Sequence, residues 1–248
     1  MSAWITLVEM ARSRIREWQA EGAQRCETEQ RPWITLAFAQ SLDGCLTFSQ
    51  GHPSALSGEA ALLLTHALRA EHRAILVGVG TVLADNPRLT VRLVSGQHPQ
   101  PLVLDTRLRT PLESHILHHP TQPPWIFTAT KAPADRRSAL EALGARIVPL
   151  VNEPGDPIPL RLMLSYLWKH GIRSLMVEGG ARVLTAFLEA RLLDAVIITL
   201  APIWIGGYHY INKLLVSPER EAPGVTLWQW EMWDRDLILW GRPRTYHI

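Results

Sequence analysis

Apolar residues near the start of the chain recur at helical spacing. Most lie three or four positions apart, which places them on one face of an α-helix. They are Trp4, Leu7, Val8, Ala11, Ile15 and Trp18. The polar stretch 21–30 is expected to link this helix to the first strand. We therefore predict an N-terminal helix and linker over residues 1–30, with the helix packing on the main domain or on a partner subunit.

From residue 33 onward, short apolar runs alternate with amphipathic segments, a pattern typical of a mostly parallel sheet covered by helices on both faces. The predicted strands are 33–39, 74–78, 101–104, 125–128, 146–150, 174–177 and 195–200. The predicted helices are 57–69, 133–144, 159–170 and 181–190, the first capped by Ser57. The tail, residues 225–240, carries only strand signals and is expected to form a hairpin through Trp233 and Asp234. We predict one α/β domain over residues 31–248, with a mostly parallel central sheet, flanking helices and an antiparallel C-terminal edge.

Length and composition fit one domain of this kind. The chain has 248 residues, 47% of them hydrophobic, which is enough to bury a full core. No run approaches the roughly 18 apolar residues that indicate a membrane span. The first residues also lack the basic and apolar regions of a signal peptide. We therefore expect a cytoplasmic protein that does not bind membranes.

The charged residues favour a small anionic ligand over nucleic acid. Net charge is +2 at pH 7, and the basic residues are scattered rather than gathered in the stripe typical of nucleic-acid binders. Most of them are arginines, whose planar guanidinium group pairs well with phosphate oxygens. The two cysteines, Cys26 and Cys45, form neither a C-x-x-C pair nor a zinc set with the histidines. We therefore expect no metal site.

The strongest chemical signal follows the strand 174–177. Glu178, Gly179 and Gly180 stand at its end, and Ala181 opens the next helix. Two glycines let the backbone approach a ligand closely, and a helix N-terminus offers free N–H groups and a positive dipole end to phosphate. A carboxylate at the carboxyl end of a strand also lies where such sheets bind ligands. The alternative interpretation is a tight strand-to-helix turn without a ligand.

Three weaker signals lie earlier in the chain. Residues 78–81, Gly-Val-Gly-Thr, follow a buried strand and favour either a packing turn or a cofactor loop, because the third glycine of a dinucleotide fingerprint is missing. Asp85 and Arg92 bracket an Asn-Pro turn. This segment is either a loop that binds a ligand or a solvated surface loop. Residues 41–45, Ser-Leu-Asp-Gly-Cys, carry an Asp-Gly turn signal.

Together, these segments and others carry a family resemblance. In chain order they read AQSLDG, SALSGEA, THALRA, AILVGVGTVLADNPRLTVR, PLVLDTRLRTP, SLMVEGGARVLTAFL and ITLAPIWIGG. Over roughly residues 31–207 this order resembles the pyrimidine reductase family of riboflavin biosynthesis. That family comprises the reductase half of the bacterial deaminase/reductase and its free-standing archaeal and fungal relatives. The resemblance implies a dihydrofolate-reductase-like fold and a homodimer.

The resemblance also implies a reaction and the residues that serve it. NADPH would reduce the ribosyl group of a 5′-phosphorylated ribosylaminopyrimidine to a ribityl group. Thr81, Asp85 and Thr106 would line the nicotinamide cofactor, and the segment from residue 179 to 186 would hold its pyrophosphate. That segment comprises Gly179, Gly180, Ala181, Arg182, Val183, Leu184, Thr185 and Ala186. The substrate-binding set would be Ser54, Arg69, Leu89, Arg92 and Glu178, with the two arginines on the sugar phosphate.

Two residues are candidates for the chemistry itself, and three for cofactor choice. A carboxylate near the sugar C1′ would stabilise positive charge or relay a proton, with Glu178 the first choice and Asp85 the second. Glu178 alternatively only hydrogen-bonds the pyrimidine. Thr128, Thr130 and Lys131 follow a strand without an adjacent acidic residue and are expected to bind the cofactor 2′-phosphate. They are the sequence basis for preferring NADPH to NADH.

Some features depart from the family pattern and keep alternatives open. Cys45 stands where the family usually has Lys, and Ala55-Leu56 where many bacterial members have Trp. The zinc-binding H-x-E…P-C-x-x-C set of the fused deaminase is not found in this sequence. The spellings AQSLD and THALR lean towards the fungal type, which reduces before deamination, yet both the amino and the oxo pyrimidine remain candidate substrates. A folate- or pterin-type reductase, or a non-catalytic nucleotide-binding relative, would be the alternative functions.

Overall fold

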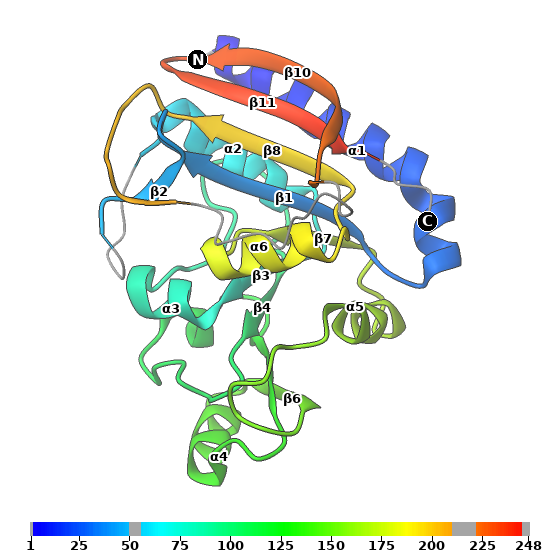
Figure 1. Ribbon diagram of the computed structural model, residues 1–248, viewed down its shortest axis with the longest axis vertical. Coiled ribbons are helices and arrows are strands. Elements are labelled where there is room, and N and C mark those ends of the chain that lie inside the picture. Colours follow the sequence, from blue (N-terminus) through cyan, green and yellow to red (C-terminus); the bar gives the residue numbers. More distant parts are fainter. Residues whose placement is uncertain (1, 50–55, 210–221, 245–248) are drawn as a thin grey trace.

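The computed structural model describes residues 2–49, 56–209 and 222–244 (Figure 1). The helices are α1 Ser2–Glu29, α2 Glu59–Ala70, α3 Val79–Asp85, α4 Ala134–Ala142, α5 Leu160–Lys169 and α6 Ala181–Glu189, with a 3₁₀ turn at His115–His118. The strands of the main sheet are β1 Trp33–Gln40, β3 Ala74–Gly78, β4 Gln100–Leu104, β5 Trp125–Ala129, β6 Arg146–Val151, β7 Ser174–Val177, β8 Ala195–Leu200, β10 Val225–Trp233 and β11 Asp236–Pro243. A small second sheet pairs β2 Cys45–Thr47 with β9 Tyr208–His209.

The main sheet is parallel through its centre and antiparallel at one edge. Within the described ranges it has nine strands in the order β10-β11-β8-β1-β7-β3-β4-β5-β6. From β8 to β6 every neighbouring pair is parallel, whereas β11 runs antiparallel to both β8 and β10. The expected hairpin turns between β10 and β11, where Asp234 adopts a φ of 57°. The predicted sheet and its C-terminal edge are therefore confirmed.

Helices cover both faces because successive strand residues point to opposite sides. In β3, Ile75 and Val77 pack with α3 and α4, while Leu76 packs with α5 and α6 on the other face. Helices α1 and α2 pack together over β1, β8 and β11. Figure 1 shows α1 behind the β10–β11 edge and α4 near the opposite end of the sheet. In the part of the chain described, no helix has both the length and the apolar character needed to cross a membrane.

The first helix extends further than its apolar pattern indicates. α1 continues to Glu29, so the polar stretch expected to be a linker is helical. Its end is fixed by a buried ion pair between Arg31 and Asp194, with nitrogen–oxygen distances of 2.6 and 3.0 Å. Burial opposes the charged form of Arg31, yet the hydrogen bonds to Asp194 outweigh it and raise the pKa of Arg31. Asp194 also accepts the backbone N–H of Ile34 at 2.8 Å, which joins α1, β1 and the start of β8.

The second helix is capped from outside its own segment. Gly58, not the predicted Ser57, is the N-cap residue of α2, and no side chain of the segment caps it. The backbone N–H of Gly58 donates instead to Asp236 Oδ2 at 2.7 Å. Asp236 is fully buried at the start of β11. The Asp236 carboxylate, which is distant in the chain, therefore takes the capping role that the local sequence assigned to Ser57. Its negative charge also complements the positive end of the helix dipole.

A buried chain of hydrogen bonds links β1 to the end of α2. Trp33 Nε1–H donates to Thr35 Oγ1 at 3.0 Å, and the Thr35 hydroxyl lies 2.8 Å from His72 Nε2. His72 Nδ1 lies 2.6 Å from the Leu68 carbonyl oxygen, so the network places the imidazole proton on Nδ1 and leaves Nε2 to accept. Every partner is satisfied only when the ring is neutral. Burial lowers the pKa of His72 from 6.5 to about 4.

This lowered pKa predicts loss of stability in acid. The unfolded chain binds a proton near pH 6.5, whereas His72 in the folded protein stays neutral down to about pH 4. Protons therefore favour unfolding in that window, and the free energy of unfolding should fall by up to about 3 kcal/mol from this residue as pH drops through it. Urea unfolding at about pH 7.5 and about pH 4.5 measures the fall. An equally large fall in His72→Gln would contradict the assignment.

Candidate active site

The turn between β7 and α6 is built by glycines that allow close packing. Glu178 extends the ladder, its N–H donating to the Leu76 carbonyl at 3.0 Å. A Cβ at Gly179 would lie 2.4 Å from Val183 Cβ, and one at Gly78 would lie 2.9 Å from Val183 Cγ2. Both glycines are therefore needed to seat the start of α6 against β3. A Cβ at Gly180 would meet only Thr81 Oγ1, at 3.6 Å, so that position faces open space.

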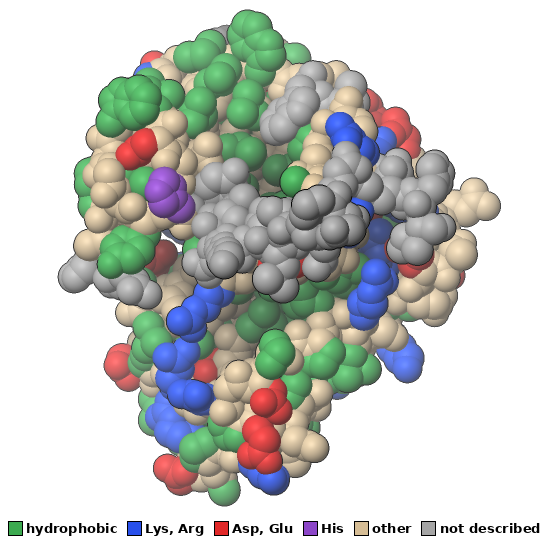
Figure 2. All heavy atoms as spheres, in the orientation of Figure 1, with side chains coloured by type: hydrophobic (Ala, Val, Ile, Leu, Met, Phe, Trp, Pro, Cys, Tyr) green, Lys and Arg blue, Asp and Glu red, His purple; other side chains and the backbone are tan. Residues whose placement is uncertain are grey.

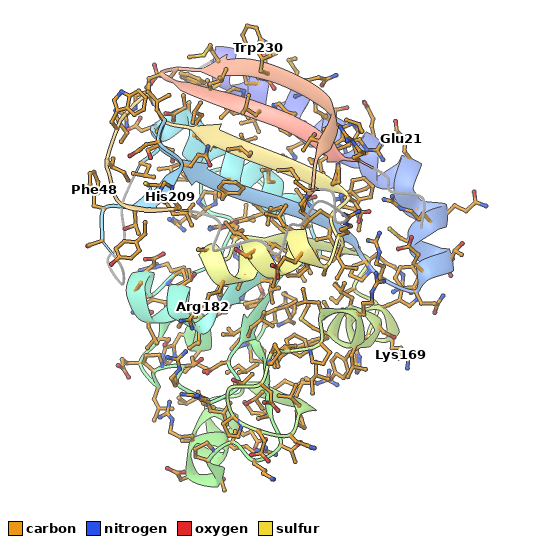
Figure 3. All side chains as sticks on the ribbon, viewed as in Figure 1. Glu21, Phe48, Lys169, Arg182, His209 and Trp230 are labelled. Atoms are coloured by element: carbon orange, nitrogen blue, oxygen red, sulfur yellow. The ribbon has the colours of Figure 1, made fainter. Side chains whose placement is uncertain are left out.

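The N-terminus of α6 is available to an anion. Gly180 is its N-cap residue and no side chain caps the helix. The Val183 N–H donates to the Gly180 carbonyl at 2.9 Å, which leaves the N–H groups of Ala181 and Arg182 available to a ligand. Their partial positive charge suits phosphate. Arg182 is exposed and projects from this first turn (Figure 3). A cation here is unfavourable for the helix dipole, and a bound anion would reverse that cost.

The predicted pyrophosphate segment divides into two parts. Val183, Leu184 and Thr185 are buried, so their side chains belong to the interior. Ala181, Arg182 and Ala186 are partly or fully exposed, and the two alanines leave the backbone accessible. Backbone N–H groups and small side chains, rather than a row of polar side chains, are therefore what this segment offers a ligand.

Arg69 and Glu178, predicted separately as substrate-binding residues, form an ion pair. Arg69 Nε and Nη2 donate to the two Glu178 carboxylate oxygens at 2.8 and 2.7 Å, and Nη1 donates to the Thr90 carbonyl at 3.1 Å. The side chains are 11% and 15% exposed. Burial opposes the charge on Arg69, but Glu178 outweighs it and raises the pKa of Arg69. This fork geometry fixes the carboxylate at the carboxyl end of β7.

A second cationic group lies beside this pair without a carboxylate partner. Arg92 is exposed and makes no ion pair with a residue of the described ranges; its backbone N–H donates to His66 Nδ1 at 3.1 Å. Partial burial, Arg69 and Arg88 together lower the pKa of Arg92. Burial, then Arg69 and Arg92, lower the pKa of His66 to about 4, so His66 is neutral at pH 7. An anion at Arg92 would relieve this mutual repulsion.

The segment after β3 is a short helix followed by a constrained turn, rather than a loop from Thr81 onward. Thr81 on α3 lies next to Gly180, which brings two predicted cofactor residues together. Asp85 ends α3 on its exposed side, and partial desolvation raises the pKa of its carboxyl group. Asn86 and Leu89 adopt positive φ values of 40° and 53°. The Leu89 side chain is buried in the core, so only its backbone is open to a substrate.

The residues expected at the 2′-phosphate are largely engaged elsewhere. Thr128 is fully buried, and Thr130 Oγ1 donates to the Val151 carbonyl at 3.2 Å. Lys131 forms an ion pair with Glu153. The expectation that no acidic residue lies here is therefore wrong, because the loop after β6 brings Glu153 to Lys131 from a part of the chain that sequence proximity does not reveal.

Two further residues of the predicted site are Thr106 and Ser54. Thr106 Oγ1 accepts the N–H of Gly155 at 3.0 Å, which ties the end of β4 to the loop after β6. Ser54 lies outside the described residues, as does the neighbouring Ala55 of the departure noted in the sequence. The roles assigned to Thr106 and Ser54 stay predictions.

The Asp-Gly turn is confirmed, and it has a partner that the sequence did not reveal. Ser41 Oγ donates to Asp43 and accepts the Cys45 N–H at 3.0 Å. Asp43 also accepts the Gly206 N–H at 2.6 Å, and these hydrogen bonds lower its pKa to about 2. Cys45 is buried, its Sγ 3.9 Å from His209 Nδ1, at the small sheet where Figure 3 marks Phe48 and His209. The only sequence signal for this contact was the Gly206-Gly207 pair, since glycines allow another segment to approach the backbone closely.

Among the described residues, no three or more His, Cys, Asp or Glu side chains are grouped so that they could hold a metal ion. Polar and basic groups converge instead on the carboxyl ends of β7, β3 and β4. The fold and the site are those of an α/β domain whose carboxyl edge suits a phosphate-bearing ligand.

Comparison with known proteins identifies the family. The chain belongs to the RibD C-terminal domain family, whose model matches residues 32–239. It is 40% identical over 177 residues to the riboflavin biosynthesis protein RibD of Bacillus amyloliquefaciens, covering 71% of this chain and 47% of that protein. It is 34% identical over 182 residues to the 2,5-diamino-6-ribosylamino-4(3H)-pyrimidinone 5′-phosphate reductase of Aquifex aeolicus, covering 72% and 80%. The chain therefore spans about half of the first relative and most of the second.

Solved structures give the same result for the fold. RibD of Acinetobacter baumannii superposes with a TM-score of 0.77 at 26% identity, covering 91% of this chain and 62% of that one. The riboflavin biosynthesis reductase Rib7 of Saccharomyces cerevisiae superposes with a TM-score of 0.67 at 26% identity, covering 87% and 91%. The predicted family and its dihydrofolate-reductase-like fold are confirmed.

The glycines at the β7–α6 turn predict contrasting stability effects. Gly179→Ala forces a Cβ into Val183 and should lower the free energy of unfolding by about 1–3 kcal/mol. Gly180→Ala meets ordinary van der Waals contact, and its φ of −73° suits any residue, so stability should change by less than about 1 kcal/mol. Urea unfolding of both variants makes the comparison. Equal destabilisation would show that Gly180 also serves packing.

Proposed function

We propose that this protein uses NADPH to reduce the ribosyl group of a 5′-phosphorylated ribosylaminopyrimidine to a ribityl group. The observation that carries the proposal is the Arg69–Glu178 ion pair beside the uncapped start of α6. The names of the relatives from Aquifex and yeast, a pyrimidinone phosphate reductase and a riboflavin biosynthesis reductase, support the same reaction class.

The residues at the carboxyl edge fit a nicotinamide dinucleotide. Gly180 leaves open the space that a side chain would fill, and the N–H groups of Ala181 and Arg182 suit the pyrophosphate. Thr81 borders this space and Asp85 lies one helical turn further along α3. When bound, NADPH supplies the hydride. The chain must hold the substrate carbon against it and keep water away.

Glu178 is the group best placed to assist the sugar. Reduction needs the C1′–O4′ bond to open, which leaves C1′ in a positively charged C=N unit until hydride adds and O4′ takes a proton. A fixed carboxylate beside C1′ stabilises that charge without having to reorganise. Arg69 holds the Glu178 carboxylate in a fixed orientation through two hydrogen bonds, so we assign Arg69 primarily a positioning role. Asp85, whose pKa is raised, is the second candidate for moving the proton.

The sugar phosphate is assigned to Arg92. Its guanidinium has no carboxylate partner in the described ranges, whereas each of the three guanidinium nitrogens of Arg69 already donates to Glu178 or Thr90. The lowered pKa of Arg92 reflects neighbouring positive charge that a phosphate would neutralise. Contact of Arg69 with the phosphate stays a prediction of the resemblance.

We also propose a cytoplasmic homodimer, on the family resemblance. The outer face of edge strand β10 carries Trp230 and Met232, which are 70% and 53% exposed. Light scattering on the purified protein determines the oligomeric state.

Turnover should depend on the Glu178 charge. Wild-type protein is expected to oxidise NADPH only when the phosphoribosylaminopyrimidine is present, with both the amino and the oxo forms tested and dihydrofolate as the negative control. Glu178→Gln keeps size but loses charge, so kcat should fall about 100-fold while NADPH affinity changes little. An unchanged kcat would reduce Glu178 to a structural residue, and turnover of dihydrofolate alone would sink the proposed reaction.

Arg92 should discriminate phosphorylated from dephosphorylated substrate. A charge-assisted hydrogen bond contributes roughly 1.5–3 kcal/mol, so Arg92→Ala should weaken the phosphorylated substrate about ten- to a hundredfold. The dephosphorylated substrate should bind the variant and the wild type alike. Because the comparison is a double-mutant cycle, general damage to the fold cancels. Similar losses for both substrates would remove the phosphate from Arg92.

A further inference from the structure

The segment that carries Arg92 has no secondary structure to satisfy its backbone. Residues 86–92 follow α3 and belong to neither a helix nor a strand. Thr90 and Val91 are buried, and the Arg92 side chain is exposed at their end. Because a buried N–H or C=O group without a hydrogen bond is costly, the polar backbone groups of this segment need partners from other elements.

Two residues of α2 provide such partners. The Thr90 carbonyl accepts Nη1–H of Arg69 at 3.1 Å, and the Arg92 N–H donates to Nδ1 of His66 at 3.1 Å. His66 and Arg69 are three residues apart, so they share one face of the helix. Arg69 also holds the Glu178 carboxylate. One face of α2 therefore positions both the carboxylate and the segment that carries Arg92.

A third side chain reaches the same segment from further along the chain. The Val91 N–H donates to Nδ1 of His98 at 3.0 Å. Between them the chain folds back onto the end of α2 at Gly96, which has a φ of 152°. A Cβ at Gly96 would lie 2.6 Å from the Ala70 Cβ, so this close approach requires glycine. Residues 90–92 are thus each tied by a separate side chain, and the backbone at Arg92 has little freedom.

The hydrogen bond to Arg92 defines the state of the His66 ring. A neutral imidazole has one nitrogen that accepts, whereas a protonated imidazole has two that donate. His66 can therefore hold the Arg92 N–H only when the ring is neutral, with its proton on Nε2. Burial, followed by the charges of Arg69 and Arg92, lowers the pKa of His66 to about 4, which keeps the ring in this state at pH 7.

Attraction of an anion does not by itself require a fixed arginine. Figure 2 shows Lys and Arg side chains gathered in a band down the lower half of one face of the molecule, and such a band attracts anions in general. A productive complex needs more, because the sugar C1′ must stay beside Glu178 while the phosphate is bound. That condition requires Arg92 to be held at a defined place relative to the carboxylate.

We propose that His66 is a positioning residue for the substrate, which aligns Arg92 with the sugar 5′-phosphate by holding the Arg92 backbone N–H. His66 is buried and acts through Arg92 rather than on the substrate itself. Without the acceptor, the Arg92 backbone loses one of the contacts that fix it, and the guanidinium loses its alignment. This inference rests on the proposed function and adds a residue that determines how well its substrate is held.

Two substitutions distinguish the two ring nitrogens of His66. Asn places its amide oxygen near the position of Nδ1, whereas Gln places its amide near that of Nε2. His66→Asn therefore keeps an acceptor for the Arg92 N–H and should leave KM for the phosphorylated substrate within about twofold of wild type. His66→Gln lacks that acceptor and should raise this KM about tenfold, with kcat nearly unchanged. His66→Leu also removes the acceptor and should act like His66→Gln.

Two comparisons test whether the effect passes through Arg92. KM for the dephosphorylated substrate should be the same in wild type and in His66→Gln, which general damage to the fold would not allow. In an Arg92→Ala background, His66→Gln should have no further effect on KM for the phosphorylated substrate, because the contact through which His66 acts is gone. His118→Gln, which replaces an exposed histidine, is the matched control and should leave both KM values unchanged.

The outcomes separate this inference from the proposed function. If wild type favours the phosphorylated substrate and His66→Gln favours it equally, His66 does not position Arg92. If His66→Asn and His66→Gln raise KM alike, acceptance at Nδ1 is not what matters. In both cases this inference fails while the proposed function stands. If wild type does not reduce the phosphorylated substrate, both fail.

Discussion

The ion pair between Arg69 and Glu178 is the constraint on which the candidate site depends. It joins the last turn of α2 to the end of β7 across 109 residues of chain. Replacing one partner of such a largely buried pair typically costs about 3–5 kcal/mol, because the other charge is left without compensation. Replacing both partners by apolar residues, in contrast, is often neutral or stabilising, so the net stability of the fold does not explain why the ion pair is present. What the pair does supply is a carboxylate of fixed orientation, with Thr90 tied to the same guanidinium.

Around that pair, the parallel sheet determines what can meet. The ends of β1, β7, β3 and β4 lie at one edge, so the residues that follow them become neighbours although the chain separates them widely. Gly179 and Gly78 let α6 approach β3, and Gly180 keeps the helix start open. Arg92, the proposed substrate-phosphate residue, lies at the same edge close enough to Arg69 for the two positive charges to interact.

The sequence predicted the elements of the fold better than their ends. Periodicity identified each strand of the parallel sheet and the C-terminal hairpin, because burial on a pleated surface leaves a strong apolar signature. It missed β2 and β9, which have three and two residues and are too short to show a periodicity. It also stopped α1 early, because the end of that helix is held by Arg31 and Asp194 rather than by an apolar stripe. Ser57 failed as a cap for a similar reason, since Asp236 reaches Gly58 from another element.

The placement of the site residues could also be predicted only in part. Motif reasoning placed Glu178, Gly180 and Thr81 correctly at one edge, since strand ends and helix starts are visible in sequence. It did not show that Arg69 pairs with Glu178. It also did not show that Lys131 pairs with Glu153, which follows a different strand and is distant in the chain. Pairings between side chains of distant segments are set by packing, and a single sequence carries no direct record of them.

The capping of α2 by Asp236 has a consequence for how the protein is made. At the N-terminus of the helix that carries Arg69, the Gly58 N–H donates its hydrogen bond to a carboxylate 178 positions later in the chain. During synthesis on the ribosome, α2 emerges long before that carboxylate exists, so the helix must wait in an unfinished state for most of translation. Completion of this domain should therefore depend on a late, long-range contact rather than proceed steadily from the N-terminus.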